Sequence, residues 1–322
     1  MNFKSAYFAT RARAQKTFSS PIRILAVVPL NRKIMTRRKA IKSAALSIGA
    51  ASLSNAIGAT EAADKLAGAE YKTNHSTCKW CYNDIPLEEL CERGQDIGLT
   101  SIELLTVDDW PTLKKYGMTC AMGTHKDFSI EEGWNDPKNH DTLREQYKKV
   151  IHDAADHGVK NVIVMSGNRR RLSDLDGMMN CAIGLRPTVK LAEEAGVTLQ
   201  MELLNSKVNH PDYMCDKTPW GAALAEMIGS PNFQLLYDIY HMQIMEGDVI
   251  DTIKKYHKYI GHYHTGGVPG RNEINDSQEL NYPAIIRAIH ETGFTGFVAQ
   301  EFVPTYDDKL KALAEGINIC NV

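Results

Sequence analysis

The sequence lacks several features that would place it in a familiar class of protein. Outside its first 63 residues it has no run of about 20 apolar residues, the length needed to cross a bilayer, so a membrane span is not expected. It has no GxGxxG motif, which disfavours a dinucleotide-binding sheet. No linker or low-complexity tract follows residue 75, so we expect one domain from residue 75 to residue 322.

Cysteine is sparse and odd in number, with 7 residues among 322. The cysteines are scattered, so they do not form an obvious disulfide framework. Cys78 and Cys81 make a lone CxxC motif, without the second pair that a four-cysteine zinc site needs. We expect packed thiols, with one pair open to oxidation if the protein is exported.

Basic residues are scarce in the body of the chain because they gather at the N-terminus. Residues 1–63 hold eleven of the 37 Lys and Arg residues and one of the 39 acids. The remaining 259 residues therefore hold 26 basic and 38 acidic residues, a formal charge of −12. Such a body repels phosphate backbones, so nucleic-acid binding is disfavoured.

Residues 1–63 are predicted to be a leader outside the folded domain. Arg37 and Arg38 precede a run of small and apolar residues, 43–59, and small-residue cleavage candidates follow it. A basic segment, a short apolar segment and a small-residue exit are the pattern of an export signal. The arginine pair resembles a twin-arginine signal, although Ala40 stands where that signal usually carries a bulky apolar residue.

Two further points about the leader stay open. Met35 stands just before the arginine pair and is the expected true start, which makes residues 1–34 an upstream artefact or extension. The long basic lead is also typical of an amphipathic or organellar-targeting helix. An exported protein is expected in the periplasm or another extracytoplasmic compartment, and a leader without function would leave it in the cytoplasm.

From residue 75 to residue 322, short apolar runs alternate with amphipathic stretches. Strands are predicted at residues 76–80, 101–105, 119–124, 161–166, 198–204, 234–238, 260–264 and 296–301. Helical patterns lie at residues 86–97, 141–157, 188–195, 219–228, 249–259, 282–292 and 307–317. Several helical patterns end with a glycine just before the next strand, which is typical of C-caps leading into buried parallel strands. This alternation extends over about 250 residues, the usual length of one barrel. It predicts an α/β fold with a single (β/α)₈ TIM barrel.

One long irregular stretch, residues 126–139, follows the third predicted strand. It is rich in Gly, Asn, Asp and Pro and contains Trp134. Loops of this length often carry function, and in a barrel this one lies on the C-terminal face. We expect a lid or an active-site wall, with a decorative surface loop as the alternative.

Four polar residues end four consecutive apolar strands in the second half of the chain. They are Glu202, Asp238, His264 and Glu301. The C-terminal strand ends of a barrel meet at one mouth, so these residues are expected to lie together. Any one of these acids alone would more simply cap a helix or form an ion pair, but three buried carboxylates repel one another unless a cation joins them. The set suits one divalent metal ion, Mn²⁺ first, with Mg²⁺ or Co²⁺ as alternatives.

The segments around these residues resemble the metal-site motifs of hydroxypyruvate isomerases, a branch of the xylose-isomerase-like enzymes, and of ketose 3-epimerases. The resembling segments are residues 201–205, 237–243, 261–273 and 300–302, in matching order and spacing. The resemblance implies that the four strand-end residues bind the metal and that Glu202 and Glu301 also act as acid and base. It further implies that His241 and Arg271 contact the substrate. The plainer alternatives are a buried core histidine for His241 and a loop ion pair with Glu273 for Arg271. Some relatives carry Gln where this chain has His264, and both residue types can donate a lone pair.

The implied activity is an isomerase that moves a proton between neighbouring carbons of an α-hydroxy carbonyl compound through an enediolate. The metal would stabilise the developing negative charge, while one glutamate takes the proton and the other returns it. Arginine is the natural bidentate partner of a keto acid. The conversion of hydroxypyruvate to tartronate semialdehyde is the first candidate. A ketose 3-epimerase or a keto-sugar or keto-inositol lyase with the same metal site is the alternative.

Two other classes are disfavoured. An endonuclease of the same fold would need more histidine ligands and a basic groove, which the charge of −12 opposes. A sugar-binding barrel without activity would not need an acid–base pair of glutamates. The expected partner is a small hydroxy-keto acid or sugar, and the sequence is compatible with a homo-oligomer.

Three weaker candidates remain. Glu103 and His125 also stand at predicted strand ends and are candidates for lining the pocket. Residues 166–171 end in three arginines, which could bind an anionic group, although a solvated basic turn is the more common outcome of such a run.

Overall fold

The computed structural model describes residues 72–322. The predicted leader, residues 1–63 with its arginine pair and Met35, lies outside the described residues and stays a prediction. Among residues 72–322, no helix is both long enough and apolar enough to span a bilayer.

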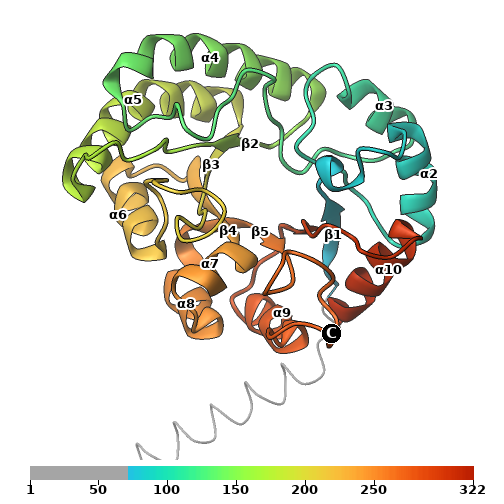
Figure 1. The fold of residues 1–322 in the computed structure, drawn as a ribbon. Coiled ribbons are helices and arrows are strands. Elements are labelled where there is room, and N and C mark those ends of the chain that lie inside the picture. The colour runs from blue at the N-terminus through green and yellow to red at the C-terminus, as the bar shows by residue number, and fades with distance from the viewer. Residues whose placement is uncertain (1–71) are drawn as a thin grey trace, which may run out of the picture. The chain divides into compact units, whose positions relative to one another are not determined.

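Six parallel strands form one sheet in the order β1-β6-β5-β4-β3-β2. Their bounds are Asn74–Thr77 (β1), Asn161–Val164 (β2), Thr198–Glu202 (β3), Phe233–Asp238 (β4), Ile260–Thr265 (β5) and Phe297–Gln300 (β6). Nearly every strand position is buried, as expected for parallel strands covered by helices. Six of the eight predicted strands are confirmed, and the fold is a parallel α/β barrel of the TIM type (Figure 1).

The two other predicted strands, residues 101–105 and 119–124, form isolated parallel bridges rather than regular strands. The bridged pairs are Cys78 with Glu103, Ser101 with Thr119, Leu105 with Gly123, and Gly123 with Val162. These bridges connect β1 to β2 and so complete the ring of segments seen in Figure 1. The prediction of regular strands is wrong here for two reasons. Leu104 has a left-handed φ of 56°, and the amide of Ala121 donates to the hydroxyl of Ser101 at 2.8 Å instead of to a neighbouring strand.

Helices surround the ring of strands (Figure 1). They are α2 (Leu87–Asp96), α3 (Trp110–Lys115), α4 (His140–His157), α5 (Asp174–Ala195), α6 (Thr218–Ile228), α7 (Ile239–Met245), α8 (Val249–Tyr256), α9 (Tyr282–Glu291) and α10 (Lys309–Ile319). Short 3₁₀ helices lie at Lys79–Tyr82 (η1), Pro137–Asn139 (η2) and His257–Tyr259 (η3). The predicted glycine caps are confirmed for α4 and α5, which end at Gly158 and Gly196 with left-handed φ angles of 75° and 67°.

Helix α5 departs most from its prediction. It begins at Asp174 rather than at residue 188, because Ser173 caps it by accepting a hydrogen bond from the amide of Asp176. The helix continues through Pro187, just after which the prediction places its start. The short helices α3 and α7 lie where no helix is predicted.

Candidate metal centre

The structure brings together the four polar residues that the sequence places at strand ends. They are Glu202 at the end of β3, Asp238 at the end of β4, His264 in β5 and Glu301 directly after β6. All four are buried, and one ligand atom from each lies within 4.8 Å of the others. Asp238 and His264 are direct partners in the register of β4 and β5, so their side chains meet at one end of the sheet.

One imidazole and one guanidinium lie among the three carboxylates. The Nδ1 atom of His264 is 2.7 Å from Oε2 of Glu301 and 3.5 Å from Oε1 of Glu202. The Nη2 atom of Arg271 is 2.7 Å from Oε2 of Glu301 and 3.3 Å from Oδ2 of Asp238. Glu301 therefore contacts both groups.

The crowding of the carboxyl groups shifts their pKa values in opposite directions. Burial raises the pKa of Glu202 and raises that of Asp238 further, and the charge of Glu301 adds to both increases. Burial also opposes ionisation of Glu301, but Arg271 and His264 outweigh it and hold its pKa well below the usual range. A divalent cation among these donors would relieve the repulsion, and an oxygen-rich set with one imidazole fits Mn²⁺, Mg²⁺ or Co²⁺.

Asp238 contributes to a helix as well as to the centre. Its Oδ1 atom accepts a hydrogen bond of 3.0 Å from the backbone amide of His241 and so caps α7. Its Oδ2 atom faces Arg271. The helix-cap and metal-ligand interpretations of this strand-end acid are therefore compatible.

His241, predicted to contact substrate, is buried beside the centre with its Nε2 atom 3.7 Å from Oδ2 of Asp238. Its Nδ1 atom accepts a hydrogen bond of 3.1 Å from the amide of Asn205, which places the ring proton on Nε2. Within residues 72–322, that Nε2 atom has no hydrogen-bond partner. Burial and the charge of Arg271 lower the pKa of His241 well below its ordinary value, so the ring is a neutral N–H donor.

Arg271, the other predicted substrate contact, is held between two aromatic rings. Its guanidinium lies 5.1 Å from the ring centre of Trp80 and 5.3 Å from that of Tyr240. Its Nε atom donates to the carbonyl of Glu301 at 3.3 Å. Trp80 adds a hydrogen bond of 2.8 Å from Nε1 to Oε1 of Glu301, so both ends of this carboxylate are positioned.

A cavity of about 290 Å³ lies beside these groups. Its polar lining consists of Trp80, Thr124, Glu202, His210, Arg271 and Glu301, and its apolar lining of Leu104, Ile130, Ile163, Met165 and Leu204. Of the four candidate ligands, Glu202 and Glu301 line the cavity, whereas Asp238 and His264 do not. Through Ile130, the 126–139 loop forms part of the wall.

Sequence reasoning did not identify Trp80 and His210, which are two of the polar residues in this lining. Trp80 ends the first predicted strand, so its position carries the same signal as the four candidate ligands, but its residue type does not suggest metal binding. His210 lies in the irregular loop after β3, where no strand end marks it.

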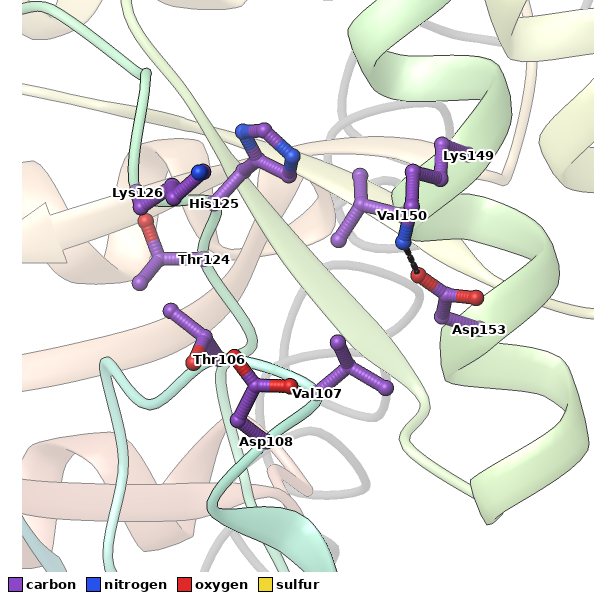
Figure 2. A pocket seen from close by; sticks show the side chains of 9 residues that line it. All are labelled: Thr106, Val107, Asp108, Thr124, His125, Lys126, Lys149, Val150 and Asp153. Carbon is purple, nitrogen blue, oxygen red and sulfur yellow. Dashed lines mark hydrogen bonds and ion pairs between the residues drawn. The ribbon is translucent and has the colours of Figure 1, made fainter.

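His125 belongs to a different pocket, of about 250 Å³. Figure 2 shows it with Thr106 and Lys126 opposite the part of α4 where Lys149 pairs with Asp153. None of the four candidate ligands lines that pocket. The prediction that His125 lines the active-site pocket is wrong, because its ring packs near the ring of Phe128, which in turn stacks on α4.

Two other motifs keep their plainer interpretation. The basic turn at residues 169–171 forms ion pairs with Asp174 and Glu132, as a solvated turn does. The two cysteines of the CxxC motif are buried free thiols, as are the other five cysteines.

The fold and the centre together define a parallel α/β barrel with an acidic candidate metal site at one end of its strands. The chain belongs to the xylose isomerase-like TIM barrel family, whose model matches residues 95–320.

Known proteins that resemble the chain agree with this family. It is 37% identical to the putative hydroxypyruvate isomerase of Homo sapiens over 117 residues, which cover 36% of this chain and 42% of that protein. It is 26% identical to the 2-oxo-tetronate isomerase of Pectobacterium atrosepticum over 235 residues, covering 69% of this chain and 88% of that one. A solved structure titled AP endonuclease, family 2, from Brucella melitensis aligns with a TM-score of 0.69 at 22% identity, covering 77% and 99% of the two chains, and supports the fold.

Proposed function

We propose that this protein is a metal-dependent isomerase that interconverts a short α-hydroxy carbonyl compound, with hydroxypyruvate to tartronate semialdehyde as the first candidate reaction. The observation that carries the proposal is the division of the four buried residues. Glu202 and Glu301 line the cavity, where a substrate carbon can reach them, while Asp238 and His264 lie behind it. This division suits two proton-transferring ligands and two residues that only hold a metal. The names of the two similar isomerases support the same class of reaction.

The side chains at the cavity supply the parts that a proton transfer between carbons needs. A divalent cation held by the four residues, Mn²⁺ in our proposal, would supply electrostatic stabilisation of the charge that develops on substrate oxygens. Glu202 and Glu301 would take and return the proton. The guanidinium of Arg271, which lines the cavity, would bind a substrate oxygen. The predicted substrate contact of His241 has no support from the cavity, because its ring is fully buried and does not line it.

The cavity also favours a short substrate. Five of the side chains that line the cavity, Leu104, Ile130, Ile163, Met165 and Leu204, are apolar and offer no hydrogen-bond partner to hydroxyl groups. A long ketose would bury several hydroxyls against these side chains without hydrogen bonds, which is costly. A three- or four-carbon keto acid has fewer polar groups, which the polar lining residues can bind. Export to the periplasm through the 1–63 leader is part of the proposal.

A substrate panel tests the proposed reaction. Metal-free protein is reloaded with Mn²⁺, Co²⁺ or Mg²⁺ and incubated with hydroxypyruvate, a four-carbon keto acid, free ketoses and keto-inositols, and the products are identified by NMR. We expect turnover of the short keto acids, loss of activity with a chelator and recovery with metal. Activity of protein shown by elemental analysis to be free of metal would refute the metal centre. Turnover of ketoses or keto-inositols alone would establish the epimerase or lyase alternative instead.

A further inference from the structure

Behind the candidate metal centre, a buried cluster takes no part in the proposed proton transfer. The Oε1 atom of Glu103 lies 2.8 Å from Nε2 of His262 and 2.8 Å from Nε2 of His264. All three side chains are fully buried, at 0% exposure. Glu103 pairs with Cys78 just after β1, and β6 separates β1 from β5, so the carboxylate reaches across the barrel interior to the two histidines.

The cluster determines which nitrogen of His264 faces the centre. A carboxylate oxygen only accepts hydrogen bonds, so the two Nε2 atoms that contact Oε1 of Glu103 each carry the hydrogen. The Nδ1 atom of His264 then lies on the side of Glu301 and Glu202, where it donates a hydrogen bond of 2.7 Å to Glu301 and lies 3.5 Å from an oxygen of Glu202. A cation bound by this nitrogen would take the place of that hydrogen. An imidazole with its outer N–H bonded to a carboxylate has the orientation and basicity of a metal ligand.

We propose that Glu103 is a positioning residue, which holds His264 with its Nδ1 atom directed at the cation, and that His262 holds Glu103 in turn. The inference rests on the proposed metal centre and is independent of the substrate. It also accounts for a carboxylate buried at this depth, because two N–H donors compensate the loss of water around Glu103.

A second cation site is the competing interpretation of the same residues. Cys78, Glu103 and His264 also offer ligand atoms within 4.8 Å of one another, and Oε2 of Glu103 has no hydrogen-bond partner in the part of the chain that the structure describes. Oε1 of Glu103 and the Nε2 atoms of both histidines are already engaged with one another, however. A cation bound there would have to break hydrogen bonds that the positioning role uses.

The test compares Glu103→Gln with the control Thr265→Val. Glutamine keeps the shape of the side chain but removes the charge that strengthens both hydrogen bonds. Thr265 is buried next to His264 in β5, and among the described residues its hydroxyl bonds to Gln300 alone. Valine therefore removes a buried hydrogen bond without changing a side chain of the centre. Mn²⁺ affinity and stoichiometry are measured by calorimetric titration of metal-free protein, and ligand geometry by the visible spectrum of the Co²⁺ form.

We expect Glu103→Gln to weaken Mn²⁺ binding roughly 10- to 100-fold, the usual effect of removing such a partner, and to alter the Co²⁺ spectrum. Thr265→Val should lower thermal stability and leave both metal readouts unchanged. If folded Glu103→Gln has the Mn²⁺ affinity and the Co²⁺ spectrum of the parent, the inference is wrong. It is also wrong if the parent chain binds two Mn²⁺ ions and the variant binds one, because Glu103 would then be a ligand of a second site. If Glu103→Gln does not fold, Glu103→Asp, which is too short to reach both imidazoles, is judged by the same two readouts. A parent protein that binds no metal would instead remove the proposed function.

Discussion

The guanidinium of Arg271 lies 2.7 Å from the Oε2 atom of Glu301. The arginine predicted to bind substrate is therefore already paired with a carboxylate that is predicted to be catalytic. The same guanidinium lies against the rings of Trp80 and Tyr240. A substrate carboxylate that binds Arg271 must therefore use its remaining N–H groups or share it with Glu301. In the proposed reaction, Arg271 therefore connects substrate binding to the position of a proton-transferring group.

Arg271→Lys tests this connection. Lysine keeps the charge but loses the planar contact with the rings of Trp80 and Tyr240. It also cannot donate from two N–H groups in one plane, as a guanidinium does. The loss of one charge-assisted hydrogen bond, about 1.5–3 kcal/mol, predicts a decrease of roughly 10- to 100-fold in kcat/KM, shared between kcat and KM. Steady-state kinetics on the substrate identified by the panel provide the measurement.

Trp80→Phe is the matched control for that variant. It keeps a ring under Arg271 and removes only the Nε1–H bond to Glu301. We expect kcat to fall with little change in KM. A rise confined to KM in both variants would show that Arg271 acts on substrate binding alone.

The two glutamates should differ from Asp238 when their charge is removed. Glu202→Gln and Glu301→Gln keep an oxygen donor but lose the proton acceptor, so each should lose about 10²–10⁴-fold in kcat while binding metal. Asp238→Asn should first lose metal affinity and recover part of its activity at high metal concentration. Incorporation of solvent deuterium at the substrate carbon separates these cases. Exchange at the parental rate in a fully metal-loaded glutamine variant would show that the substituted glutamate does not abstract the proton.

Acid should destabilise the fold through two histidines that are not part of the centre. His75 forms a hydrogen bond with Asn321 and His290 forms one with Thr73, and burial is the main reason that the pKa of each lies below 6.5. The unfolded chain therefore binds more protons as pH falls below 6.5, so their contribution is present above that pH and is lost below it.

The corresponding measurement is the free energy of unfolding between pH 7.5 and about 5 in denaturant titrations of chelator-treated protein. We expect His75→Gln, which cannot be protonated, to flatten the decline relative to the parent. An equally steep decline in both proteins would assign the acid sensitivity to other groups.

Export is the prediction that concerns the leader. Arg37→Lys combined with Arg38→Lys should trap unprocessed protein inside the cell, because the arginine pair is the feature that resembles a twin-arginine signal. Fractionation and immunoblotting measure it, with Lys39→Arg as a control that leaves the pair intact. Normal processing of the double variant would exclude a twin-arginine route.

The residues that could be predicted from the sequence are those whose position allows few physical alternatives. A charged residue ending a buried strand needs a partner, and parallel strands bring such ends together, which is why Glu202, Asp238, His264 and Glu301 are found as one cluster. Fold class and the glycine caps follow equally from local chemistry. The outcome for residues 101–105 depended on the backbone of Leu104, which no pattern of polarity reveals.

The contact of Glu103 with His262 and His264 could not be predicted either, and the reason is different. Sequence reasoning places Glu103 at a strand end, but its partners His262 and His264 lie three positions away around the ring. Whether a side chain spans that gap depends on the curvature of the barrel and on the order of its strands. These are properties of the assembled sheet.

The cap that Asp238 places on α7 has a practical consequence for observing the centre. The backbone amide of His241 donates to one oxygen of this carboxylate, while the other oxygen faces Arg271. A change in the charge on Asp238 therefore changes the strength of a hydrogen bond at an identifiable peptide group. The His241 amide, followed by NMR, would therefore report occupancy of the proposed metal centre and would need neither substrate nor an attached probe.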